Sequence, residues 1–100
     1  MDKSSAITIA CIQMEPSFGD TAANVEASVR RIVEAADNGA RLIVLPELAN
    51  TGYVFATREE AFALAEAVPD GPSSRRWMEV AAARNLYIVA GITERDGQSL

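Results

Sequence analysis

Apolar residues occur along this chain in two patterns, as short runs and as helical stripes. The runs lie within residues 6–12, where Thr8 interrupts the run, 41–45 and 86–93, and they consist largely of aliphatic side chains. Continuous apolar runs of this length are typical of strands in the interior of a protein. We therefore predict three strands, of which the first is buried and the second, at 41–45, is covered on both faces.

Apolar residues three and four positions apart predict a helix over residues 21–37. The stripe consists of Ala22, Val25, Val29, Ile32, Val33 and Ala36. Asp20 is placed to cap the start of this helix, and Asn38-Gly39 supplies a left-handed stop after its end.

Two further helices are predicted between the second and third strands. Thr57 and Glu60 fit a capping box, which opens a helix that reaches about residue 67. A Pro-Asp-Gly-Pro turn at 69–72 separates it from a helix over residues 73–84. The order strand, helix, strand, helix, helix, strand indicates an α/β fold with helix-covered strands.

The end of the chain suggests a strand that is cut short. Asp96-Gly97 is a strong hairpin signal, but a partner strand from Gln98 would stop at Leu100. We interpret residues 1–100 as the N-terminal part of a single longer domain, and we expect a molecule that ended at Leu100 to be inactive.

Composition and charge limit the classes of function. The chain has 100 residues, 49% of them hydrophobic and 23% charged, which is typical of one small globular domain. Its net charge is −5 and it has no basic cluster, so we expect it to bind neither nucleic acid nor a membrane surface. It has no histidine, and its single cysteine cannot form an internal disulfide. The apolar stretch near the N-terminus is too short to span a membrane, and we expect a cytoplasmic protein.

The acid Glu47 comes almost directly after the most hydrophobic run. Ligands of α/β proteins gather at the carboxyl ends of strands. Pro46 lacks an N–H group and fixes its own φ, so it ends the strand pairing and sets the direction of the next residues. An acid held there could act as a general base at the mouth of a pocket. It could also be an exposed residue in a turn without a catalytic role, and spacing alone favours this second interpretation.

Three other residues are candidates for a site. Cys11 lies among aliphatic residues of the first strand, where we expect a buried and inert thiol. Tyr53 and Phe55 come after the break at Gly52. They could form the walls of a pocket or cover the core.

Three blocks of the sequence, in this order, resemble the nitrilase or carbon-nitrogen hydrolase superfamily. The first is the strand "ITIACIQM", which is succeeded by Gly-Asp and by a helix with Asn24 near its start. The second, "NGARLIVLPELANTGYVF", is similar to the family's hydrophobic run, Pro-Glu pair and Gly-Tyr pair. The third, "AEAVPDGPSSRRWMEVAAARNLYIVAGITER", looks like its Gly-Pro turn, helix and strand that ends in glycine.

The resemblance implies a four-layer αββα sandwich, of which these residues form the front part, and a homodimer or a higher homo-oligomer. It implies hydrolysis of a non-peptide carbon–nitrogen bond in a small molecule by a Glu-Lys-Cys triad, with no metal or organic cofactor. Glu47 matches the family's glutamate, which is the general base. The "ANTGYVF" stretch suggests that Tyr53 and Phe55 form apolar walls of the substrate pocket. The lysine and the cysteine of the triad would lie beyond residue 100, and Lys3 and Cys11 do not match them.

Several functions remain open within and beyond this resemblance. We expect an amidase that releases ammonia or an amine, and the alternatives are a nitrilase and an N-carbamoyl amine hydrolase. A non-catalytic binding or assembly module on the same scaffold would use Glu47 only structurally. An ordinary doubly wound nucleotide-binding domain is the weakest interpretation, because residues 11–19 contain a single glycine.

Overall fold

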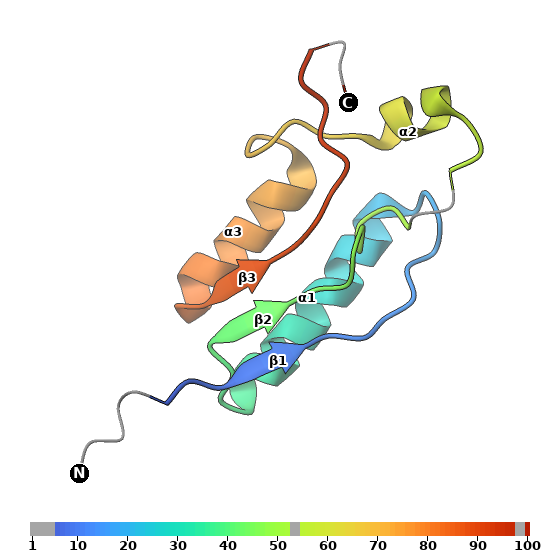
Figure 1. Ribbon diagram of the computed structural model, residues 1–100. Helices are drawn as coiled ribbons and strands as arrows, with labels where there is room; N and C mark the ends of the chain where they lie inside the picture. Colours follow the sequence, from blue (N-terminus) through green and yellow to red (C-terminus); the bar gives the residue numbers. More distant parts are fainter. Residues whose placement is uncertain (1–5, 53–54, 98–99) are drawn as a thin grey trace.

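The computed structural model describes residues 6–52, 55–97 and 100 (Figure 1). Its elements occur in the predicted order. They are β1 (Ile9–Cys11), α1 (Thr21–Asp37), β2 (Leu42–Val44), α2 (Arg58–Leu64), α3 (Pro72–Arg84) and β3 (Tyr87–Val89). The α/β class is confirmed, although each strand is shorter than predicted.

The three strands form one parallel sheet in the order β1-β2-β3. Ala10, Ile43 and Ile88 stand side by side at the centre of the three strands. Parallel neighbours need a long crossover connection. Helix α1 lies in the first crossover, and α2 and α3 lie in the second (Figure 1). The carboxyl ends of all three strands therefore lie at the same edge of the sheet.

The hydrophobic core lies between the sheet and the helices α1 and α3. Ile32 of α1 and Ile43 of β2 have no exposed surface. The other buried members are Val25, Val29, Ala40, Leu45, Ala49, Trp77, Val80 and Leu86. The indole N–H of Trp77 donates to Ser28 Oγ at 2.9 Å, so the polar edge of this buried ring is satisfied.

Ion pairs connect α1 and α3 on the solvent side. Arg76 Nε lies 2.8 Å from Glu26 Oε2, and Arg84 Nη1 lies 2.7 Å from Asp37 Oδ1. The hydrogen bond from Arg76 holds the pKa of the Glu26 carboxyl below its ordinary value.

The opposite face of the sheet is open in the described part of the chain. Ile9, Tyr87 and Val89 are exposed there, Tyr87 to 70%. On β2 itself, Leu42 and Val44 of this face are half-buried. Since α1 and α3 both pack on the other face, the coverage of residues 41–45 on both faces stays a prediction. Cys11, which we expected to be buried, is exposed.

The capping box predicted before α2 is present, but the helix is shorter than expected. Thr57 Oγ1 accepts a hydrogen bond from the N–H of Glu60 at 3.0 Å. The helix ends at Leu64 rather than near residue 67, because Ala65 is extended. The backbone of Glu66 then pairs with the segment after β3, since its N–H donates to Thr93 O at 3.1 Å.

Helix α1 has the bounds that the apolar stripe predicts, and Gly39 after it has a left-handed φ of 98°. Asp20 precedes the helix but makes no side-chain capping bond. None of the described helices is long and apolar enough to cross a membrane.

Candidate active site

Glu47 lies on a turn that is hydrogen-bonded to the segment at the end of β3. The N–H of Leu45 donates to Val89 O at 2.9 Å, and the N–H of Leu48 donates to Gly91 O at 3.0 Å. The proline between them has no N–H, so regular pairing stops there. Glu47 therefore leaves the sheet at the edge where ligands of α/β proteins bind.

The backbone directly after Glu47 is strained. Leu48 has a left-handed φ of 52°, a conformation that costs a non-glycine residue about 1–2 kcal/mol. The N–H groups of Thr51 and Gly52 both donate to Leu48 O, at 3.2 and 2.8 Å, and close the turn. Strain of this kind persists only where the surroundings impose it, and it is concentrated at functional sites.

The loop after β1 packs against this turn. The N–H of Gly19 donates to Thr51 O at 2.9 Å. A Cβ atom on Gly52 would lie 3.4 Å from the Cα atom of Phe18, so the two backbones approach closely. The ring of Phe55 meets that of Phe18 edge to face, with 5.4 Å between their centroids.

The buried side chain of Asn24 forms hydrogen bonds to the same two loops. Its Oδ1 accepts from the N–H of Ser17 at 2.9 Å, and its Nδ2 donates to Ser17 O at 2.7 Å. Nδ2 also donates to Asn50 O at 3.0 Å. The asparagine near the start of the first helix, which contributed to the resemblance, thus ties the Glu47 turn to α1.

The predicted site residues have different surroundings. The Glu47 side chain is exposed, and Phe55 is half-buried against Phe18. Tyr53 lies outside the described residues. An exposed carboxylate on a rigid turn can accept a proton from a group that approaches it. Among residues 6–52, 55–97 and 100, no group of three His, Cys, Asp or Glu side chains could hold a metal ion.

A buried acid that the sequence did not single out lies next to this turn. Glu66 is 8% exposed, and its Oε1 accepts from the N–H of Ser73 at 2.8 Å. Its Oε2 accepts from Ser73 Oγ at 2.7 Å and from Asn50 Nδ2 at 3.5 Å. A polar residue inside the apolar stretch before a Gly-Pro turn is the sequence signal that could have pointed to it.

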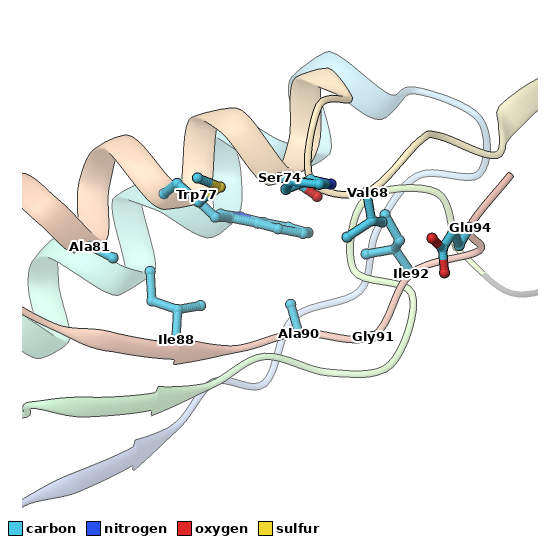
Figure 2. Close-up of a pocket in the computed structure, with 11 residues that line it drawn as sticks. Val68, Ser74, Trp77, Ala81, Ile88, Ala90, Gly91, Ile92 and Glu94 are labelled. Atoms are coloured by element: carbon cyan, nitrogen blue, oxygen red, sulfur yellow. The ribbon is translucent and has the colours of Figure 1, made fainter. Parts of the chain in front are cut away.

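A cavity of about 530 Å³ lies elsewhere, between α3 and the segment that continues from β3 (Figure 2). Its wall on the helix side includes Trp77 and Ala81, and its opposite wall includes Ile88, Ala90 and Ile92. Neither Glu47 nor Phe55 lines it. The cavity therefore does not coincide with the predicted site.

The parallel sheet with helices on one face defines an α/β protein. The acid on a strained turn lies at the carboxyl ends of the strands, where α/β proteins bind their ligands. The carbon-nitrogen hydrolase family model matches residues 8–100. The chain belongs to the carbon-nitrogen hydrolase family.

Curated relatives of this chain include nitrilases and an amidase. A nitrilase of Pyrococcus abyssi is 43% identical over 94 residues, which cover 94% of this chain and 36% of the relative. An aliphatic nitrilase of Rhodococcus rhodochrous is 32% identical, with 100% of this chain and 30% of the relative covered. A 2-oxoglutaramate amidase of Bacillus subtilis is 34% identical, with 84% and 30% covered. The chain thus spans about a third of the length of these relatives.

Proposed function

We propose that the protein to which this chain belongs hydrolyses a non-peptide carbon–nitrogen bond, with Glu47 as the general base. The observation that carries the proposal is the position of Glu47, which directly precedes the strained Leu48 on a turn at the carboxyl edge of the sheet. Membership of the carbon-nitrogen hydrolase family supports it.

The proposed reaction uses a thiol and an ammonium group that would lie beyond residue 100. Glu47 accepts the thiol proton, and the thiolate attacks the carbonyl or nitrile carbon. The lysine ammonium stabilises the negative charge that develops in the tetrahedral intermediate. With an amide, Glu47 passes the proton to the leaving ammonia or amine and then activates the water that releases the acid. With a nitrile, a first water adds to the thioimidate before ammonia leaves, and a second water releases the acid.

The exposed face of the sheet supports the proposed αββα layering. Ile9, Tyr87 and Val89 together form an apolar surface on β1 and β3. Exposed apolar patches of this kind usually mark a surface that another element covers. We propose that the remainder of the protein supplies a second sheet on this face.

Residues 1–100 do not separate amide from nitrile hydrolysis. We propose amide hydrolysis first, because amidases are the commoner assignment in this superfamily, and the names of the relatives favour nitrile hydrolysis as a second candidate. The relatives from Pyrococcus abyssi and Rhodococcus rhodochrous are called nitrilases, and the one from Bacillus subtilis is called an amidase. Tyr53 and Phe55 would accept a substrate with a hydrophobic or planar acyl part. A nitrile and an amide that share this part separate the two reactions.

The test is ammonia release by the full-length protein from benzonitrile, benzamide, propionitrile and propionamide. We expect turnover of at least one of these compounds and, in Glu47→Gln, a loss of about 100- to 10,000-fold, which is the usual contribution of a general base. Glu59→Gln, which changes an exposed acid on α2, is the matched control and should keep wild-type turnover. Wild-type turnover by Glu47→Gln would contradict the proposal.

A further inference from the structure

Asn50, Glu66 and Ser73 form a buried hydrogen-bonded cluster next to the Glu47 turn. All three residues are at most 8% exposed. Ser73 Oγ lies 2.7 Å from Glu66 Oε2 and 3.1 Å from Asn50 Nδ2. The cluster joins three segments that are separate in the sequence.

The direction of each hydrogen bond in this cluster is set by the chemistry of the groups. A carboxylate can only accept, so the Ser73 hydroxyl donates to Glu66 and must itself accept from the amide of Asn50. The amide nitrogen of Asn50 consequently faces the cluster. Its orientation therefore depends on the acid at Glu66.

Asn50 is held by both its side chain and its backbone. Its carbonyl oxygen accepts from Asn24 Nδ2 at 3.0 Å, which fixes it to α1. Its side chain reaches Ser73 near the start of α3. Because Asn50 comes three residues after Glu47, on the turn that Leu48 O closes, these bonds fix the turn from two sides.

We propose that Glu66 is a positioning residue, which acts through Ser73 and Asn50 to hold the turn that carries Glu47. This inference rests on the proposed function of Glu47. Capping of α3 is a simpler role for Glu66, but it requires only the bond from the N–H of Ser73 to Oε1. The second carboxylate oxygen is directed to Ser73 Oγ and Asn50 instead.

The test compares two single variants, each of which leaves a donor or an acceptor of the cluster without its partner, with a double variant that reverses the hydrogen bonds and keeps their number. In Glu66→Gln, the new amide still accepts from the N–H of Ser73, but its nitrogen and that of Asn50 both donate to Ser73 Oγ. In Asn50→Asp, two carboxylates compete for one hydroxyl proton. In the double variant, the new amide at position 66 donates to Ser73 Oγ, which donates to the new carboxylate at position 50.

The measurements are kcat and KM of the full-length protein for the best substrate among benzonitrile, benzamide, propionitrile and propionamide, together with the melting temperature. We expect each single variant to lose up to about 100-fold in kcat, which is the usual effect of a displacement of about 1 Å at a catalytic group. KM should change little, and the double variant should regain most of the kcat. Val80→Ala, which weakens the packing of α3 away from the cluster, should lower the melting temperature and leave kcat unchanged.

Ser73→Ala gives a second test, because it removes the connecting hydroxyl and leaves the backbone capping bond in place. We expect it to lower kcat even if the Glu66 variants fold poorly. If Glu47→Gln is inactive while Ser73→Ala and the single variants keep wild-type kcat, the positioning role is wrong and the proposed function stands. A double variant that remains as slow as the single variants would also overturn it. If Glu47→Gln keeps wild-type turnover, the proposed function and the inference fail together.

Discussion

Glu47 lies on the turn after β2 and Glu66 on a segment that is bridged to Glu94, and the surroundings of the two acids are opposite. Glu47 is exposed and comes soon after β2, whereas Glu66 is buried and accepts three hydrogen bonds. Because Glu66 is buried and both of its carboxylate oxygens accept hydrogen bonds, we assign it the role of holding Ser73 and Asn50 in place. Exposure on a fixed turn leaves Glu47 able to exchange protons. The acid that we assign to catalysis is thus distinguished by the strained and hydrogen-bonded backbone at Leu48 rather than by burial of its side chain.

The largest expected effect on stability separates the two acids. Glu66→Ala leaves Ser73 and Asn50 with buried donors that have lost their acceptor, and each such donor costs about 1–3 kcal/mol. We expect a decrease of about 3 kcal/mol or more in the free energy of unfolding, measured with urea. Glu47→Ala should change it by less than about 0.5 kcal/mol, because that side chain is exposed. Equal decreases in the free energy of unfolding of the two variants would contradict the difference between the two acids.

A glycine next to Glu66 allows a steric test of the same cluster. A Cβ atom on Gly71 would lie 2.6 Å from Ala67 O and 2.8 Å from Glu66 Oε1, although the φ of this glycine is an ordinary −70°. We expect Gly71→Ala to destabilise the protein by about 1–3 kcal/mol. The control is Gly91→Ala, since a Cβ atom there meets no neighbour within 4 Å. If Gly71→Ala leaves the free energy of unfolding unchanged, the residues around Gly71 can rearrange to accept the methyl group.

The smallest effect concerns Glu26, an exposed acid that is paired with Arg76. Its pKa is lowered in the folded protein, mainly by the hydrogen bond from Arg76. The pair therefore stabilises the fold above the ordinary pKa of glutamate, about 4.3, and this contribution is lost as the pH falls through the lowered value. The melting temperature of wild type should fall slightly more on acidification than that of Glu26→Gln. Identical pH profiles would mean that the pair contributes nothing measurable.

Elements of the fold could be predicted from the sequence where a pattern within a single segment determines them. The stripe of α1 and the capping box at Thr57 are local patterns. The capping bond is present, and the stripe is buried at Val25, Val29 and Ile32, whereas Ala22 at its start is exposed. The open face of the sheet was not predictable, because an apolar run shows that a strand is suited to burial but not which elements cover it. Cys11 is exposed for this reason.

The candidate site was predictable in part. The position of Glu47 at a strand end could be inferred from the apolar run and from Pro46. The cluster of Asn50, Glu66 and Ser73 joins residues that are up to 23 positions apart, so no local pattern reveals it. The left-handed Leu48 was also missed, because leucine does not normally signal that conformation.

The proposed role of Glu47 as the general base can be tested by chemical rescue of Glu47→Ala in the full-length protein. The measurement is the rate of ammonia release from the best substrate, in sodium formate and in sodium chloride of equal ionic strength. We expect a loss of about 100-fold or more in chloride, which formate partly restores because a small carboxylate can occupy the exposed position. Glu66→Ala should show no response to formate. Turnover by Glu47→Ala within about twofold of wild type in chloride would contradict the assignment of Glu47 as the general base.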